Sequence, residues 1–297
     1  MRKARMIVEV LLIAGLLLSA CAAPTQAPSA TEVPAATEAP AATEAPVETE
    51  APVVTVAPVV TEAPAAGGIP DLGGKVVTVA VENAYPPFNS IDPQTSEGVG
   101  WDYDVVKEIC KRLNCVAEFK QAAWDGIFPA MQAGEFDVLA DGVTITAERD
   151  EIVDFSLPYV TVGQVLLVRA DETRDVEAMK ADSAALVGTQ IGTTNEIVAK
   201  ENFPAERVKS FEDFGAAVLA LMAKDVDGVV IDNVSATGYM GENEGKMKIG
   251  GQLTSDEQLG FVFPPGSELK AAWDTALQAM KDDGTLDKFN KKWGLIQ

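Results

Sequence analysis

Charged, polar and aromatic residues follow four short apolar runs of the sequence, and these residues are the ones that could do chemistry. With one glycine among them, they are Glu82, Tyr85, Asp141, Gly142, Thr144, Arg149, Gln190, Thr193, Thr194 and Asp232. The chain has no histidine, so it lacks the usual proton shuttle at neutral pH, and Ser-His-Asp and Cys-His catalysis are excluded. Any acid catalysis would therefore depend on a carboxyl group, for which Glu82 and Asp141 are the candidates.

Acidic residues dominate the charge of this chain of 297 residues, in which 45 Asp and Glu oppose 23 Lys and Arg for a net charge of −22. Nucleic-acid binding depends on Lys and Arg contacts with phosphates, so no nucleic-acid partner is expected. The 3 cysteines are too few for a disulfide scaffold or for a zinc site built from four cysteines. We expect neither a metal nor a cofactor.

The N-terminus has the pattern of an export signal, which we assign to residues 1–20. Arg2, Lys3 and Arg5 precede an apolar run that ends near Leu18 and is interrupted by one glutamate. This run is short for a permanent membrane span. The following Leu-Ser-Ala-Cys resembles a bacterial lipobox, in which Cys21 is lipidated and anchors the mature protein to a membrane. An ordinary secretory signal followed by an incidental cysteine is the alternative.

Residues 21–74 are predicted to be a disordered tether. Thr-x-x-Pro repeats through this segment, which has no aromatic residue and whose apolar residues are almost all Ala and Val. Such a composition buries too little apolar surface to offset the entropy of ordering the chain. The segment would lift a folded domain, residues 75–297, off the membrane, so we expect an extracytoplasmic protein.

Strands and helices alternate in the pattern of this domain. Short β-branched or apolar runs predict strands at 76–81, 116–119, 136–140, 165–168, 186–188 and 228–231. Helical spacing of apolar residues predicts helices at 101–113, 124–133, 195–201, 211–223, 268–281 and 285–293. This alternation indicates an α/β fold with mostly parallel sheets. Ligands of such folds bind beyond the carboxyl ends of the strands, where the candidate residues lie.

An ordered set of motifs then narrows the fold. It consists of YPPF (85–88), GWD (100–102), WDGIFPAMQAGEFDV (124–138), GVTITAER (142–149), VDFSLPY (153–159), GTT (192–194) and DDGTLDKFNKKWG (282–294). In these motifs the chain resembles the extracytoplasmic polar amino-acid-binding proteins of ABC importers, solute-binding protein family 3. The resemblance implies the type II periplasmic-binding-protein fold, with two α/β lobes joined by a two-strand hinge. Lobe 1 would comprise about 75–162 and 259–297 and lobe 2 about 163–258, with hinges near 159–163 and 258–261.

The resemblance also implies roles for the candidate residues. Arg149 corresponds to the arginine that binds the ligand α-carboxylate, and a guanidinium group suits that carboxylate bidentately. The backbone N–H groups of Thr144 and Thr194 would add donors for the same carboxylate, and Thr193 is a further candidate beside Thr194. Gly142 and Asp232 would receive the α-ammonium group, and Tyr85 and Trp124 would enclose the side chain. Helix capping is the alternative role of the two threonines at 193 and 194.

The selectivity for the ligand side chain rests on fewer residues. Glu82 lies in the loop before Tyr85, and Asp141 stands where relatives often have a small residue. Two carboxylates beside aromatic rings would suit a cationic side chain, so a basic amino acid such as Arg or Lys is favoured. If Asp141 instead bonds inside its own lobe, glutamine or another polar amino acid becomes the ligand. Gln190 is a further candidate for contact with the side chain.

The two cysteines of the domain allow two interpretations. Cys110 and Cys115 fit the end of a helix and the start of the next strand, where they would form either a local disulfide or two buried thiols.

The resemblance implies a monomer without catalytic residues that delivers its ligand to an ABC permease. An enzyme on the same fold, such as a periplasmic dehydratase or a lytic transglycosylase, and a ligand-sensing lipoprotein are more remote interpretations.

Overall fold

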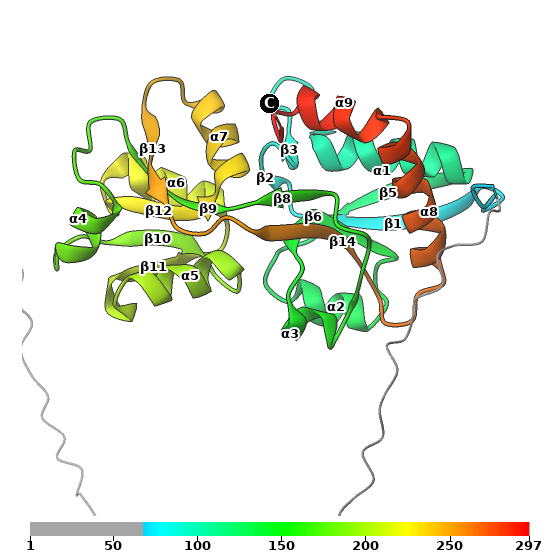
Figure 1. Cartoon of the computed structure of the whole chain (residues 1–297), viewed down its shortest axis with the longest axis horizontal. Helices are drawn as coiled ribbons and strands as arrows, with labels where there is room; N and C mark the ends of the chain where they lie inside the picture. The colour runs from blue at the N-terminus through cyan, green and yellow to red at the C-terminus, as the bar shows by residue number, and fades with distance from the viewer. Residues whose placement is uncertain (1–67, 297) are drawn as a thin grey trace, which may run out of the picture. The chain divides into compact units, whose positions relative to one another are not determined.

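Two mixed β-sheets form the framework of the part of the chain that the computed structural model describes, residues 68–296 (Figure 1). The export signal, Cys21 and nearly all of the expected tether lie outside these residues. The first sheet has the order β5-β1-β6-β14-β7, with β8 also paired to β14. Its strands are β1 (Lys75–Val81), β5 (Cys115–Gln121), β6 (Val138–Thr144), β7 (Asp154–Phe155), β8 (Val160–Val162) and β14 (Glu257–Phe263).

Helices cover both faces of this first sheet, and together they form the first lobe (Figure 1). The helices are α1 (Trp101–Leu113), α2 (Ile127–Gln132), α3 (Ala147–Asp150), α8 (Leu269–Asp282) and α9 (Thr285–Lys292). In α1 and α8 the buried residues recur with helical spacing along one side, as expected for amphipathic helices on a sheet. Near its end, α1 is joined to β5 by a disulfide between Cys110 and Cys115, whose Cα atoms are 4.6 Å apart.

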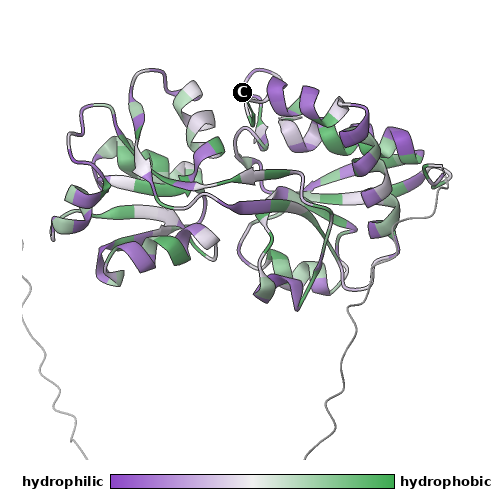
Figure 2. Ribbon diagram, in the orientation of Figure 1, coloured by the Kyte–Doolittle hydropathy of each residue, from purple (hydrophilic) through white to green (hydrophobic). Residues whose placement is uncertain are grey.

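The second lobe is built on a sheet of order β11-β10-β12-β9-β13. Its strands are β9 (Gln164–Arg169), β10 (Val187–Gln190), β11 (Val208–Phe211), β12 (Gly228–Asp232) and β13 (Met247–Gln252). Its helices are α4 (Val176–Ala181), α5 (Thr194–Asn202), the single-turn η1 (Ala205–Arg207), α6 (Phe214–Ala223) and α7 (Asn233–Glu242). In both sheets hydrophobic residues gather along the central strands, and hydrophilic residues lie on much of the helical surface (Figure 2).

The chain passes between the two sheets twice. The first passage is Gly163, between β8 and β9, and the second is residues 253–256, between β13 and β14. Leu253 N donates to Gln164 O (2.7 Å) and Gln164 N to Thr254 Oγ1 (2.9 Å), so the passages bond side by side. A Cβ atom at Gly163 would collide with the carbonyl oxygen of Thr254. The second hinge was expected near 258–261, but those residues lie inside β14, paired with β6 and β8.

Several element boundaries differ from the sequence-based prediction. Strand β6 runs on through Asp141 and Gly142 to Thr144, because Val143 and Thr144 pair with the antiparallel β14. Helix α2 begins at Ile127, after Gly126 with φ +84°, so Trp124 lies before the helix. The predicted strands and helices omit the small sheet of β2 (Ala84–Tyr85), β3 (Asn89–Ile91) and β4 (Gly98–Val99). They also omit the elements that occur only through long-range pairing, such as β14.

Residues 71–74, at the end of the expected tether, contact the first lobe. Leu72 N donates to Leu113 O (2.7 Å), and Asn114 Nδ2 donates to Asp71 Oδ1 (2.7 Å). These bonds tie the chain to the end of α1 before β1 begins. None of the helices among residues 68–296 is long and apolar enough to cross a membrane.

Candidate functional site

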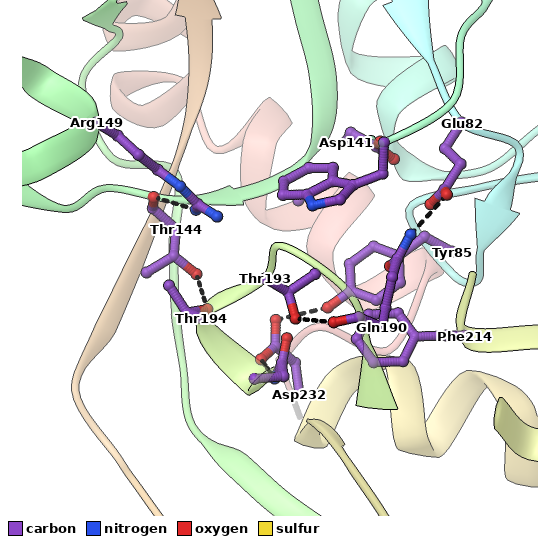
Figure 3. Close-up of a pocket in the computed structure, with 13 residues that line it drawn as sticks. Glu82, Tyr85, Asp141, Thr144, Arg149, Gln190, Thr193, Thr194, Phe214 and Asp232 are labelled. Atoms are coloured by element: carbon purple, nitrogen blue, oxygen red, sulfur yellow. Dashed lines mark hydrogen bonds between the residues drawn. The ribbon is translucent and has the colours of Figure 1, made fainter. Parts of the chain in front are cut away.

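One pocket collects the candidate residues of the sequence at the ends of strands from both lobes (Figure 3). Its cavity volume is about 20 Å³, room for little more than one water molecule. It is lined by Glu82, Tyr85, Trp124, Asp141, Gly142, Thr144, Arg149, Gln190, Thr193, Thr194, Asn195, Phe214 and Asp232. Every residue that the sequence nominated for the ligand is in this set, together with Asn195 and Phe214, which it did not nominate.

Arg149 supplies the positive charge of the pocket. Its guanidinium Nη1 donates to the carbonyl oxygen of Thr144 (2.9 Å). Its Cζ atom lies 5.3 Å from the centroid of the Trp124 ring and 4.8 Å from that of Phe128. Burial lowers the pKa of Arg149 to about 10, so the group stays charged at neutral pH. Within residues 68–296 no carboxylate forms an ion pair with it, which leaves donors for an anionic group.

Asp232 supplies a buried negative charge where β12 ends and α7 begins. Its Oδ2 accepts from the Tyr85 hydroxyl (2.6 Å), and its Oδ1 accepts from Asn195 Nδ2 (2.8 Å). Burial raises the pKa of Asp232 to about 6, against the opposing effect of these two donors. The carboxylate is therefore ionised at neutral pH. It is held between the two lobes, since Tyr85 lies in the first and Asn195 in the second.

Three threonines place hydroxyl and backbone groups between Arg149 and Asp232. Thr193 is the N-cap of α5: its Oγ1 accepts from Glu196 N (3.1 Å) and donates to Gln190 O (2.7 Å). Thr194, the first residue of α5, meets Thr144 of the first lobe with 3.3 Å between their hydroxyl oxygens. The N-terminus of a helix carries free N–H groups and a partial positive charge. This part of the pocket therefore suits an anionic group, and the capping role of Thr193 is compatible with it.

Aromatic rings form the wall beside Asp232. The Tyr85 ring stacks on Phe88 with 5.5 Å between centroids and on Phe214 of the second lobe with 5.3 Å. Gly142, with φ +57°, brings the β6 backbone against this wall, and a Cβ atom there would lie 2.7 Å from Tyr85 Cε1. Trp124 also lines the pocket, beside Arg149. A ligand side chain in this space would contact flat apolar surfaces.

Glu82 and Asp141 make the opposite end of the pocket acidic, and Figure 3 shows Glu82 and Arg149 on opposite sides. Glu82 Oε1 accepts from Gln190 Nε2 of the second lobe (2.7 Å). Burial, followed by the nearby charge of Asp141, raises the pKa of Glu82 to about 9. Burial likewise raises the pKa of Asp141 to about 7. Asp141 both lines the pocket and accepts a hydrogen bond from Asn89 Nδ2 inside its own lobe (2.7 Å).

The two residues that the sequence did not nominate are ordinary in type. Phe214 opens α6 after the N-cap Asp213 and was assigned to a helix. Asn195 follows the GTT motif and was also placed in a helix. Phe214 reaches the pocket because α6 begins against Tyr85, and Asn195 reaches it because the start of α5 lies beside Asp232. The position directly after GTT was the one signal that could have nominated Asn195; Phe214 had none.

The pocket holds charges but no recognisable metal site. Among residues 68–296 no group of His, Cys, Asp and Glu side chains has the arrangement that a metal ion needs. What the pocket can do chemically is to pair an anion near Arg149, a cation near Asp232 and a flat or cationic group near the aromatic wall and Glu82.

Two α/β lobes, two passages between them and a charged pocket at the strand ends define a two-lobed solute-binding protein of the type II periplasmic-binding-protein class. Comparison with known proteins agrees. A sequence model of the bacterial extracellular solute-binding proteins, family 3, matches residues 77–296. The chain belongs to this family, and the identification made from its motifs is confirmed.

Relatives of known structure or function share most of the domain. The L-cystine-binding protein TcyA of Bacillus subtilis is 32% identical over 220 residues, which are 73% of this chain and 81% of the relative. An ancestral arginine-binding protein solved with glutamine bound is 39% identical, with a TM-score of 0.68, and covers 73% of this chain and 97% of that one. The arginine-, lysine-, histidine-binding protein ArtJ of Geobacillus stearothermophilus is 32% identical, with a TM-score of 0.68, and covers 74% and 95%.

Proposed function

We propose that this protein binds a basic amino acid, with arginine or lysine as the ligand, and delivers it to the permease of an ABC importer. The observation that supports this most directly is the order of charges along the pocket. In Figure 3 Arg149 lies on one side of the pocket and Glu82 with Asp141 on the other, while Asp232 lies below and between them. A basic amino acid presents the complementary order of α-carboxylate, α-ammonium and side-chain cation.

Each ligand group has a counterpart in this arrangement. Arg149 and the Thr144 and Thr194 backbone N–H groups bind the α-carboxylate, where charge-assisted hydrogen bonds are strong. Asp232 and the Gly142 carbonyl bind the α-ammonium. Tyr85 and Trp124 pack against the aliphatic part of the side chain, and its cation lies between Glu82 and Asp141.

Binding would close the two lobes around the ligand. The first lobe supplies Arg149 and the acidic end, and the second supplies Thr194, Asp232 and Gln190. We propose lobe boundaries of about 75–162 with 259–297 and about 163–258, with the passages between the lobes acting as the hinge. The closed form would be favoured only as far as the ligand binds it more tightly than the open form. The permease would recognise that closed form.

Glutamine is the second candidate, because two hydrogen bonds at the pocket and one solved relative favour it. Asp141 already has a partner in Asn89, and the Gln190 amide already lies against Glu82. A ligand carboxamide could take the place of the Gln190 amide at that carboxyl group. One of the solved relatives has glutamine bound.

A calorimetric panel tests the proposal. The purified protein is titrated with arginine, lysine, ornithine, glutamine and citrulline, the last being a neutral isostere of arginine. We expect arginine or lysine to bind at least tenfold more tightly than citrulline, a difference of about 1.4 kcal/mol. Asp141→Asn should lessen this preference. Binding of glutamine and citrulline as tight as that of arginine would leave an amino-acid-binding protein without a basic preference.

The protein is further proposed to be a binding protein and not an enzyme, since the charge order above suits an intact amino acid. A dehydratase on this fold would use Glu82 or Asp141 as an acid. Chromatography of arginine and of prephenate after prolonged incubation with the protein tests this, and recovery of both unchanged is expected.

Anchoring at the membrane completes the proposal. We propose that residues 1–20 are removed, that Cys21 carries lipid and that residues 21–74 tether a monomeric domain outside the cytoplasm. The support is the sequence of these residues. The mass of the mature protein tests it: a lipid-modified Cys21 is expected, and an unmodified Cys21 would contradict it.

A further inference from the structure

Behind the acidic end of the pocket, three buried carboxyl groups lie together with one amide between two of them. Asn89 Nδ2 donates to Asp141 Oδ1 (2.7 Å) and to Asp102 Oδ2 (2.8 Å), while Asn89 Oδ1 accepts from Asn83 N (2.7 Å). The exposed fraction is 8% for Glu82, 4% for Asp141 and 0% for Asp102. We call Glu82, Asp141 and Asp102 the acidic cluster. Asp102 and Asn89 do not line the pocket, so the cluster reaches deeper than the pocket wall.

No cation neutralises the acidic cluster. Across residues 68–296, none of the ion pairs includes one of its three carboxyl groups. Asp102 Oδ1 is buried without any hydrogen-bond partner. A buried charge without a partner costs several kcal/mol, so a buried carboxyl group takes up a proton instead. Burial accordingly raises the pKa of Glu82 to about 9, of Asp102 to about 8 and of Asp141 to about 7.

The groups that face the cluster from neighbouring elements supply no positive charge either. Tyr85 of β2, Tyr103 of α1 and Tyr159 before β8 are phenols whose pKa values lie above the usual one, because of burial and of nearby carboxylates. Gln190 of β10 is neutral, and Asp213 before α6 adds negative charge near Glu82. Only a proton or a cationic ligand can therefore neutralise the cluster.

We propose that the acidic cluster holds a proton while the pocket is empty and releases it when the cationic side chain of the ligand enters, with Asn89 and Asp102 as positioning residues that set this exchange. The inference rests on the proposed function, since only a cationic ligand can replace the proton. The O–H bond of one carboxylic acid breaks, the proton passes to solvent, and the carboxylate left behind pairs with the ligand cation. Asn89 donates to both Asp141 and Asp102, so it stabilises the ionised form of either one.

Proton exchange makes arginine affinity depend on pH. At low pH the ligand must displace protons, and at high pH the cluster is already ionised, so arginine binds more tightly as the pH rises. Release of one proton corresponds to a change in Kd of about tenfold per pH unit. The window lies between about pH 6 and pH 9, around pKa values of about 7, 8 and 9. Citrulline has the same shape and no side-chain charge, so it has no reason to displace the proton.

Calorimetry in buffers of different ionisation enthalpy counts the protons directly. Near neutral pH, where burial keeps part of the cluster protonated, we expect arginine to release more protons than citrulline. Groups at the α-amino end, such as Asp232, release the same number of protons with both ligands, so their contribution cancels in the comparison. Asp102→Asn keeps an oxygen that accepts from Asn89 and removes one acid, so it should flatten the pH dependence of the arginine Kd. Asp104→Asn, on the same helix but bonded to Lys292 and Trp293, is the matched control and should leave the proton count unchanged.

Infrared difference spectroscopy gives a second readout that does not depend on the variants folding. A protonated carboxyl group has a C=O band that a carboxylate lacks, and arginine should reduce this band in the wild-type protein. Equal proton release by arginine and citrulline, with both bound, would overturn the inference and leave the proposed function standing. Arginine failing to bind at any pH would overturn both. An unchanged pH slope in Asp102→Asn would overturn the role of Asp102.

Discussion

Arg149 shows how one residue combines two roles at the end of the pocket. Its guanidinium group stacks beside Trp124 and Phe128, bonds to Thr144 O and keeps further N–H donors free of carboxylate partners within residues 68–296. A planar group with donors along two edges can bind a carboxylate bidentately, whereas an ammonium group cannot. The residue type therefore matters beyond its charge.

We expect Arg149→Lys to weaken arginine binding about 10- to 100-fold, the loss of roughly one charge-assisted hydrogen bond. Titration calorimetry measures this Kd. The matched control is Arg169→Lys: Arg169 bonds to Leu221 O and Val226 O inside the second lobe, away from the pocket. That control should lower the melting temperature and leave the Kd unchanged. An Arg149→Lys protein that binds arginine as tightly as wild type would mean that Arg149 only packs against the aromatic rings.

At the scale of elements, α7 of the second lobe packs on the loop that contains the YPPF motif. The Tyr239 hydroxyl donates to Ala84 O (2.7 Å), and Gly238 approaches Pro86 so closely that a Cβ atom there would lie 2.6 Å from the Pro86 oxygen. Neither Tyr239 nor Gly238 lines the pocket. This contact therefore joins the lobes outside the pocket, and under the proposed closure it would stabilise the closed form.

We expect Tyr239→Phe to weaken all ligands by the same factor, because it lowers only the population of the closed form. Loss of one hydrogen bond of about 0.5–1.5 kcal/mol corresponds to a factor of about 2–10 in Kd. Calorimetry with arginine and lysine measures the two factors. Unequal factors would indicate that Tyr239 acts on the ligand side chain and not on closure. Tyr103→Phe, whose hydroxyl bonds to Asn83 within the first lobe, is the control.

At the scale of the whole molecule, the buried carboxyl groups link stability to pH. Carboxyl pKa values raised in the folded state mean that the folded protein binds more protons than the unfolded chain above about pH 4. This contribution to stability is complete below the unfolded pKa and is lost as the pH rises through the folded pKa values of about 7, 8 and 9 for Asp141, Asp102 and Glu82.

We expect the melting temperature of the ligand-free protein to fall between pH about 5 and pH about 9, with a limiting slope of about 1.4 kcal/mol per pH unit per proton. Differential scanning calorimetry over this range measures it. Asp141→Asn should be more stable than wild type at the alkaline end, because it removes a buried charge, although its preference for arginine is lessened. A melting temperature that rises with pH in the ligand-free protein would contradict this account of the cluster.

The sequence by itself determines the fold class, the family and the candidate residues of the pocket. The alternation of apolar strands and amphipathic helices determines the α/β class, since burial of one face depends on local periodicity. The loops after β1, β10 and β12 place Glu82, Gln190, Thr193, Thr194 and Asp232 at strand ends, and motif order identified the family. All nominated ligand residues line one pocket for that reason.

Only the tertiary structure decided which groups meet across long distances in the chain. Strand β14 exists because it pairs with β6, β7 and β8, and no local pattern predicts such partners. No local pattern predicts the contact of Phe214 with Tyr85 either, or the hydrogen bonds from Asn89 to Asp102 and Asp141. Long-range packing buries these carboxyl groups without a cation, and burial, not residue type, sets their proton affinity.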